Sequence, residues 1–589
     1  MSNKTFIKGK DRDLESSIET MLAKLEALDI HIEEVSWLNP VPHVYSVHIR
    51  DKECPLIFTN GKGVCKKSAL ASALGEFFER MSCNYFFADY YLGEEFSHAE
   101  FVHYPNEQWF AMTQQMPDEL LDEALWDFYD PDGDLLPENI FELNSGSGER
   151  GVCALPFTRV RDEKEILFPV NLIANLYVSN GMAAGNTKAE ARVQALSEIL
   201  ERYVKNKIIS EGLCLPEIPD TVIQRFPHAK KAIDKLKEHG YNLRVADASL
   251  GGVYPVISVT LMNPNNGSVF ASFGAHPCFE VALERTVTEL LQGRGIDQLD
   301  SFSAPSFNMA EVSDTHNLIE HFINSSGLIS YNFFKDKPNY EFVDWNHDAD
   351  TQSEFEYLSA LIHNKGRNIY IADYEHLNVY TCRVIVPGMS EIYPIEDLEW
   401  SNNNESSSVR ESILSLKNLD EDELRELLDD LEYGSAPDTQ KVSELIGIVP
   451  DSNTLWETLQ IGELKAMLCF ALKDYSGAQE WNSWSLLMEQ TDEKRTRHHR
   501  CLAALLEILL DDDKGLDEYQ DSLVLIYTTE SVRLCIDIIK GNEVFYGLHS
   551  PGLSLDGFRA HKKLLESYAK VHKAKQKYHN QKGELQTHE

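Results

Sequence analysis

Apolar and polar residues alternate over several short stretches in the first two thirds of the chain, the pattern of half-buried β-strands. Residues 44–50 and 55–59 alternate on either side of a polar turn, and residues 256–263 and 268–273 do so around a turn of proline, two asparagines and glycine. Both pairs predict hairpins, and residues 166–178 predict a further strand. Each strand region leads into a long stretch rich in alanine and leucine. Alternating sheets and helices predict an α/β fold.

After about residue 394 the pattern changes to one that is almost entirely helical. Residues 401–408, SNNNESSS, are polar and low in complexity, which is typical of a linker. An acidic helical pattern follows at 420–432, and the small and aromatic spacing of residues 464–467 and 478–482 resembles tetratricopeptide helix pairs. We therefore predict two domains: an α/β domain at residues 1–405 and an all-α, tetratricopeptide-like domain at residues 406–589.

An internal repeat lies inside the predicted α/β domain. Residues 63–80, GVCKKSALASALGEFFER, align without a gap with residues 185–202, GNTKAEARVQALSEILER, which begin 122 positions later. Eight of these eighteen positions are identical, which chance does not readily produce. The alignment predicts a duplicated sheet-plus-helix unit.

A weaker third copy, RTVTELLQ at residues 285–292, shares one polar pattern with the other two. In each copy a polar residue is followed four positions later by glutamate, and three positions after that by glutamate or glutamine. The trios are Ser72, Glu76 and Glu79; Gln194, Glu198 and Glu201; and Arg285, Glu289 and Gln292. This spacing places each trio on one stripe of a helix, and the apolar residues between them can pack on a sheet.

Small residues flank these stripes, so the carboxylates can face one another. Converging glutamates without matched cations would repel and raise each other's pKa, and oxygen ligands favour Mg²⁺ or a similar hard cation. A single stripe of this kind is usually a solvated helix face, but three related stripes favour a shared metal–anion site. Glycine-rich helix starts at 61–63 and 185–187, together with Arg80, Arg202 and Arg285, fit Mg–nucleotide binding.

Other motifs and the composition narrow the function further. The chain has no H-E-x-x-H, no P-loop and no C-x-x-C motif, which argues against a zincin, a P-loop enzyme, a zinc ribbon and an iron–sulfur site. A net charge of −41 argues against unspecific nucleic-acid binding. No apolar run reaches the ~18 residues of a bilayer span, and the polar start is unlike a signal peptide. We expect a cytoplasmic protein with no membrane or direct nucleic-acid partner.

At these residues the chain resembles the YcaO family, ATP-utilising proteins whose signature is this triple set of acidic helices. The resemblance covers about the first 400 residues, from the FIKGKD start through ASALGEFFER, QALSEILER and RTVTELLQGR to VPGM at 386–389. The WLNPVP and SFGAHP segments and the helical last third are similar to bacterial members that assist the radical enzyme RimO. RimO methylthiolates an aspartate in a small-subunit ribosomal protein.

The resemblance implies the cofactors ATP and Mg²⁺ and a set of residues that bind them. The implied ATP contacts are Lys10, Ser17, Ser72, Glu79, Asn186, Glu190, Gln194, Arg202 and Arg285, and the implied Mg²⁺ ligands are Glu76, Glu198, Glu201 and Glu289. In the family, ATP activates a backbone amide, whose oxygen takes the γ-phosphoryl group. Positioning and charge neutralisation then supply most of the catalysis. The resemblance also suggests a homodimer.

Cyclodehydratase members of the family end in a proline-rich tail near the active site. This chain ends in QKGELQTHE after a helical domain, which argues against heterocycle formation. We therefore expect a Mg²⁺-dependent ATP-binding and ATP-hydrolysing protein that assists RimO-dependent β-methylthiolation, with a RimO-like methylthiotransferase and the ribosomal protein as partners. The alternatives are a cyclodehydratase-like enzyme that activates peptide amides, and an interaction scaffold that ATP only stabilises. The chain lacks the clustered cysteines that a methylthiotransferase itself would need.

Overall fold

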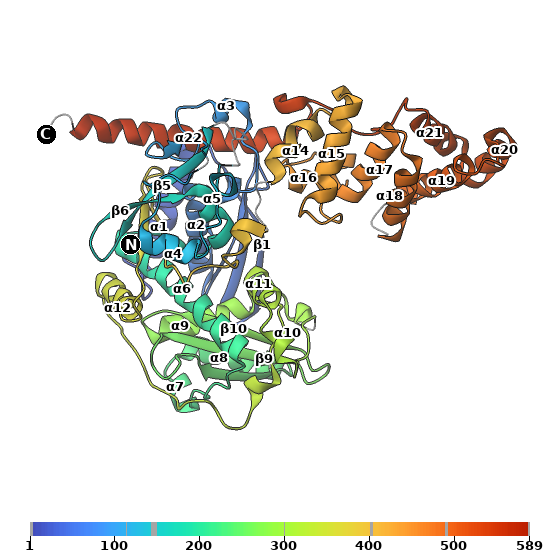
Figure 1. The fold of residues 1–589 in the computed structure, drawn as a ribbon. Coiled ribbons are helices and arrows are strands. Elements are labelled where there is room, and N and C mark those ends of the chain that lie inside the picture. Colours follow the sequence, from blue (N-terminus) through green and yellow to red (C-terminus); the bar gives the residue numbers. More distant parts are fainter. Residues whose placement is uncertain are drawn as a thin grey trace.

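The computed structural model describes residues 4–113, 115–142, 150–299, 301–400, 405–488 and 493–586. Figure 1 shows a core of sheets and helices, from which an array of helices extends to one side. The prediction of an α/β core followed by a helical region is confirmed. Among the described residues, every helix is too short or too polar to cross a bilayer.

Two three-stranded antiparallel sheets contain the predicted hairpins. The first has the order β1 (Ile32–Val41), β2 (Val44–Asp51), β3 (Phe58–Gly63), and the second has the order β10 (Val269–Ala275), β9 (Val256–Met262), β8 (Asn242–Asp247). In the first hairpin Val47 pairs with Gly61, and in the second Phe273 pairs with Ser258. Both hairpins are confirmed, but the second strand of the first one begins at Phe58, because residues 55–57 belong to the turn.

The third sheet joins strands that lie far apart in the chain. Its order is β4 (Gln108–Phe110), β5 (Val152–Arg159), β11 (Tyr370–Tyr374), β12 (Tyr380–Ile385), β7 (Met182–Gly185), and β6 (Glu165–Pro169) pairs with β5. The prediction of one strand over 166–178 is wrong beyond residue 169, because Val170–Tyr177 forms helix α5. Leu172, Ile173 and Leu176 are buried at a helical spacing, so tertiary packing selects the 3.6-residue period for this apolar run.

The internal repeat corresponds to three strand–helix units. These are β3 with α2 (Lys66–Ser82), β7 with α6 (Lys188–Glu211) and β10 with α9 (Phe279–Leu290). Each strand lies at the edge of its own sheet, and each helix packs back on its strand. Each helix also contacts the strand of another unit: α2 packs on β7, α6 on β10 and α9 on β3. This cyclic set of contacts holds the three helices around a common space.

Glycine in the strand allows the close strand–helix packing. A Cβ atom at Gly61 would lie less than 3.0 Å from backbone atoms of Ala69 and Ala73 in α2. A Cβ atom at Gly274 would lie 2.8 Å from Ala282 O in α9. Ala69 and Ala282 hold equivalent positions in the repeat, so a glycine faces an alanine at both places.

The remaining helices of the core cover the sheets and connect the units. They are α1 (Leu14–Ala27), α3 (Gly93–Ser97), α4 (Glu123–Tyr129), α7 (Asp220–Ile223), α8 (Pro227–Glu238), α10 (Met309–Val312), α11 (Thr315–Ile323), α12 (Thr351–His363) and α13 (Asp397–Trp400). α1 packs on α2, α12 on α6, and α8 on α9. The helices that carry the acidic stripes are therefore backed by further helices.

The helical region packs its helices against their near neighbours. It contains α14 (Glu405–Leu414), α15 (Glu421–Tyr433), α16 (Val442–Leu445), α17 (Ile461–Ala471), α18 (Tyr475–Leu487), α19 (Glu493–Leu509), α20 (Leu516–Tyr527), α21 (Thr529–Ile539) and α22 (Arg559–Gln586). Residues 495–500, RTRHHR, form a charged run of the kind that usually lies on a solvated helix face. In the structure, however, Arg495 and His499 are buried and their side chains contact Glu463. The tetratricopeptide-like character of the region stays a prediction.

The last helix, α22, leaves the helical array and runs along the α/β core (Figure 1). Its Tyr568 lies in the same apolar cluster as Phe77 and Phe78 of α2. Lys575 lies in a basic stretch of the kind that is usually solvated, yet it is buried, and its Nζ donates a hydrogen bond to His103 O at 2.8 Å. α22 therefore ties the helical region to the core.

Candidate functional site

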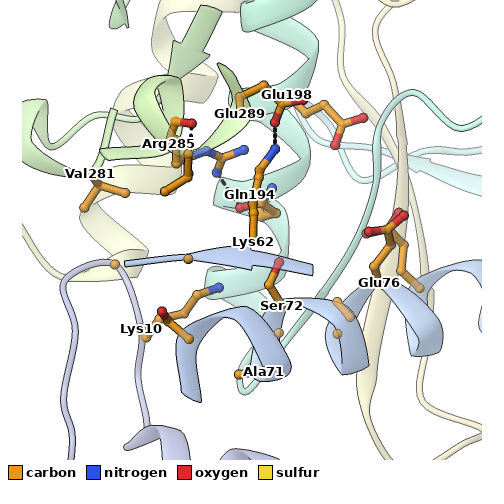
Figure 2. Close-up of a pocket in the computed structure, with 18 of the residues that line it drawn as sticks. Lys10, Lys62, Ala71, Ser72, Glu76, Gln194, Glu198, Val281, Arg285 and Glu289 are labelled. Atoms are coloured by element: carbon orange, nitrogen blue, oxygen red, sulfur yellow. Dashed lines mark hydrogen bonds and ion pairs between the residues drawn. The ribbon is translucent and has the colours of Figure 1, made fainter. Parts of the chain in front are cut away.

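A cavity of about 1140 Å³ opens where the three strand–helix units meet. Figure 2 shows side chains of α2, α6 and α9 converging on it, together with Lys10 from the N-terminal segment. All thirteen residues predicted for the site line this cavity: Lys10, Ser17, Ser72, Glu76, Glu79, Asn186, Glu190, Gln194, Glu198, Glu201, Arg202, Arg285 and Glu289. The structure thus brings the whole predicted set together, and what each residue binds stays a prediction.

The side chains converge because each helix has two opposed faces. The apolar residues between the stripe positions, such as Phe77, Ile199 and Leu290, are fully buried. Burying that face fixes the rotation of the helix on its sheet, so the polar stripe turns toward the common cavity. Ser72 is exposed and lines the cavity, and its Oγ forms no hydrogen bond with any described residue.

Cations partner some of the carboxylates. Arg80 pairs with Glu76 at 2.8 Å and Arg202 pairs with Glu198 at 2.7 Å, each one helical turn away. Lys62, which reaches in from β3, forms an ion pair with Glu289 (Figure 2). Lys62 was not among the predicted site residues. Its place between two glycines, in a glycine-rich strand that leads into an acidic helix, is the signal that could have found it.

Burial and like charges shift pKa values where the glutamates of the three stripes gather, which we call the acidic end of the cavity. Burial, with the nearby carboxylates of Glu198 and Glu76, raises the pKa of Glu79 well above its usual value. Burial also lowers the pKa of Lys62 to about 8. Among the residues that the structure describes, no cation lies within ion-pair distance of the carboxylates of Glu79 and Glu201. A divalent cation would relieve this repulsion.

The carboxylates do not form a closed metal cage. Among the described residues, no three histidine, cysteine, aspartate or glutamate side chains are grouped closely enough to hold one ion. This arrangement still suits Mg²⁺, which usually binds through one or two carboxylates, several waters and the phosphates of a substrate. The donor set, all oxygen and beside Arg80, Arg202 and Lys62, therefore fits a metal–phosphate complex rather than a metal ion alone.

The opposite end of the cavity is organised around Glu190. Its carboxylate pairs with Lys10 at 3.1 Å, accepts a hydrogen bond from the Asp11 amide at 2.9 Å and accepts others from Asn186 Nδ2. Burial raises the pKa of Glu190, but the charge of Lys10 and these hydrogen bonds together hold it below its usual value. Ser17 Oγ donates to Asn186 Oδ1 at 2.8 Å. Glu190 thus anchors the N-terminal segment at the start of α6.

Arginine and glutamine connect the two ends. Arg285 Nη1 donates a hydrogen bond to Gln194 Oε1 at 2.5 Å, which links α9 to α6 across the cavity (Figure 2). The guanidinium of Arg202 lies 4.5 Å from the ring centre of Phe322, and its Nη1 is buried without a partner among the described residues. The cavity therefore offers cationic donors beside its carboxylates, the combination that a metal-bound polyphosphate needs.

Two family models and two known proteins match this chain. A family model described as "YcaO cyclodehydratase, ATP-ad Mg2+-binding" matches residues 60–390, and one described as "YcaO cyclodehydratase C-terminal domain" matches residues 406–577. An uncharacterized protein of Haemophilus influenzae is 50% identical over 582 residues, 98% of this chain and 99% of that protein. The ribosomal protein S12 methylthiotransferase accessory factor YcaO of Escherichia coli K12 is 51% identical over 577 residues, 97% of this chain and 98% of its own.

Solved structures are similar at lower identity. YcaO from Methanopyrus kandleri bound with AMPPCP and Mg²⁺ is 15% identical, with a TM-score of 0.42, covering 68% of this chain and 97% of that one. A heterocyclase in complex with substrate and cofactor is also 15% identical, with a TM-score of 0.42, covering 67% of this chain and 56% of that one.

Proposed function

The chain belongs to the YcaO family, and we propose that it binds ATP with Mg²⁺ in the cavity between α2, α6 and α9 and hydrolyses it. The family model that matches more than half of the chain describes ATP and Mg²⁺ binding. The observation that carries the proposal is the convergence of three acidic stripes from three helices on one cavity that also holds arginines and lysines.

The proposed roles fall into two groups, residues that hold the metal ion and residues that contact the nucleotide. Glu76, Glu198, Glu201 and Glu289 would hold Mg²⁺, which supplies charge neutralisation at the phosphates. Arg80 and Arg202 keep the carboxylates of Glu76 and Glu198 oriented by ion pairs. The remaining predicted contacts to ATP are Lys10, Ser17, Ser72, Glu79, Asn186, Glu190, Gln194, Arg202 and Arg285.

Glu190 is an exception in this group, because protein donors already occupy its carboxylate. We propose that its part in ATP binding is indirect. It holds Lys10 and the N-terminal segment at the cavity, and Lys10 then contacts the nucleotide.

We propose further that the protein assists a RimO-like methylthiotransferase in the β-methylthiolation of an aspartate in ribosomal protein S12. The support is the 51% identity to an accessory factor of that name, which extends through the helical region as well as the core. The division at residue 405, the tetratricopeptide-like repeats, the homodimer and the cytoplasmic location belong to the same proposal. A second candidate is phosphoryl transfer to a peptide amide, which the cyclodehydratase description of the family model favours.

The experiment compares phosphate release by the wild-type protein with that by Glu198→Gln and Glu211→Gln. Both residues lie on α6, but Glu211 is outside the cavity and pairs with Lys207. Glu198→Gln should lose ATP turnover while keeping the wild-type circular dichroism and melting temperature, and Glu211→Gln should retain turnover. Chelation of Mg²⁺ should abolish turnover in the wild-type protein and in Glu211→Gln. Wild-type turnover by Glu198→Gln would contradict the assignment of the site.

A further inference from the structure

The turn that leads from α5 into β7 has an unusual backbone. Val178 adopts φ 49° and ψ −115°. Branching at Cβ makes a positive φ especially unfavourable for valine, and such conformations persist only where the surrounding structure enforces them. They concentrate at functional sites, so the turn merits a functional explanation.

Contacts with residues outside the cavity lining hold this turn in place. Arg383 Nη2 of β12 donates a hydrogen bond to Val178 O at 2.5 Å. Asn180 Nδ2 donates to Ser390 O at 2.7 Å, and the Asn180 amide donates to Tyr177 O at 2.8 Å. These hydrogen bonds fix the conformation of the turn before any ligand binds.

Ser179 is the residue that this turn presents to the cavity. It lines the cavity although it is only 8% exposed, and its Oγ forms no hydrogen bond with any described residue. The repeat offsets of 122 and 91 positions make Ile57 and Phe270 its equivalents in the other two units. Both are apolar, so the strand–helix unit does not itself require a hydroxyl at this position.

The turn with Ser179 precedes β7, and β7 runs alongside α6, the helix that carries one of the acidic stripes. A Cβ atom at Gly185 would lie 2.6 Å from Ala191 N, and one at Gly181 would lie 3.2 Å from Ile199 Cδ1. Moving back along β7 therefore follows α6 from its start toward Glu198 and Arg202. Ser179 lies in the turn two residues before Gly181, and it lines the cavity that these glutamates and arginines share.

We propose that Ser179 Oγ donates a hydrogen bond to the terminal phosphate of the bound nucleotide, so that the cavity distinguishes a nucleoside triphosphate from a diphosphate. The inference rests on the proposed function, which puts Mg²⁺ and the phosphates at the acidic end. A neutral hydroxyl contributes a donor without adding charge to a site already rich in ion pairs. Because the turn is fixed in advance, little ordering entropy is lost when the bond forms.

The test is calorimetric titration of the full-length protein with a non-hydrolysable ATP analogue and, separately, with ADP, both with Mg²⁺. Ser179→Ala should weaken analogue binding about tenfold or more, the loss expected of a hydrogen bond to a charged group, and leave ADP binding within about twofold. Ser179→Cys should act in the same way, and Ser179→Thr should retain the discrimination. The matched control is Ser197→Ala on α6, whose buried hydroxyl has no hydrogen-bond partner among the described residues and lies outside the cavity lining.

Each result separates this inference from the function on which it rests. If the analogue and ADP weaken equally, or neither changes, in both Ser179→Ala and Ser179→Cys, the inference is wrong while nucleotide binding stands. If Ser179→Ala does not fold, the ratio of the two affinities in Ser179→Cys decides. If the wild-type protein binds neither nucleotide, the proposed function itself fails, and the inference with it.

Discussion

Replacing Glu190 with glutamine tests whether the N-terminal segment is held to the cavity by one buried carboxylate. The side chain of Glu190 is 2% exposed, and its two oxygens receive the Asp11 amide, Asn186 Nδ2 and the ammonium of Lys10. Glutamine has nearly the same shape but keeps only one acceptor oxygen. It therefore loses at least one charge-assisted hydrogen bond and turns an amide donor toward other donors.

The magnitude follows from these contacts. A hydrogen bond to a charged group contributes about 1.5–3 kcal/mol, and leaving a buried partner unsatisfied costs a similar amount. Lys10 is 32% exposed and can be rehydrated, so its ion pair adds only about 1 kcal/mol or less. We expect the free energy that holds residues 4–13 against the cavity to fall by about 3 kcal/mol. This is about a 100-fold change in the equilibrium constant between the closed and the open segment.

Hydrogen exchange followed by mass spectrometry measures this closure directly. Amides of residues 4–13 should lose about 100-fold of protection in Glu190→Gln, and affinity for a Mg²⁺–ATP analogue should fall because Lys10 leaves the cavity. The matched control is Glu280→Gln, which removes a half-buried partner of Lys8 on the same segment and should change protection only slightly. Unchanged protection in Glu190→Gln, together with weaker nucleotide binding, would refute the anchoring role and favour direct contact between Glu190 and ATP.

The same contact predicts a pH dependence. The pKa of Glu190 is lowered in the folded protein, so its stabilising contribution is present above the free value of 4.5. That contribution is lost as the pH falls through the lowered value. Acid should therefore release residues 4–13 in the wild-type protein, and the released fraction should not depend on pH in this way in Glu190→Gln.

Three further predictions concern stability. Gly61→Ala puts a methyl group against helix backbone and should lower the free energy of unfolding by about 3 kcal/mol. At Gly75 no atom of the described residues outside its own helix lies within 4 Å of an added Cβ, so Gly75→Ala should raise that free energy by up to about 1 kcal/mol. Equal shifts in melting temperature would contradict the packing described. Burial lowers the pKa of Lys575 from 10.5 to about 7, so folding releases a proton between these two pH values and stability should rise with pH. In urea unfolding at pH 7 to 9, the free energy of unfolding should rise less steeply with pH in Lys575→Met than in the wild-type protein. Tyr568→Ala should cost about 4 kcal/mol and Tyr568→Phe about 1 kcal/mol, because only the first opens the contact between α22 and the core.

The docking of α22 also affects how the role of the helical region can be tested. Leu564, Tyr568 and Val571 belong to the apolar cluster that includes α2, one of the three site helices. Removing residues 406–589 would therefore expose part of the core, and a loss of ATP turnover would not show what the helical region does. Substitutions on the surface of that region, with α22 kept, separate the two roles.

Local properties of the chain determined much of the site. The stripe of Ser72, Glu76 and Glu79 and its two relatives follow from the helical period, which depends only on residues within a few turns. The repeat offset of 122 positions then implies that equivalent residues occupy equivalent places. For this reason the stripe residues line one cavity once the chain is folded, whereas Lys10, Ser17, Asn186 and Glu190 are implied only by the family resemblance.

Tertiary structure decided which partner each of these groups meets. Lys62 reaches Glu289, Lys10 reaches Glu190, and Lys575 is buried beside His103, although each pair is far apart in the chain. No local period specifies such meetings, because they depend on how edge strands and helix faces from distant segments pack. The same holds for residues 170–177, whose apolar run suits either period until neighbouring side chains select the helix. Sequence determined the faces of the elements, and the packing of those faces determined the chemistry between them.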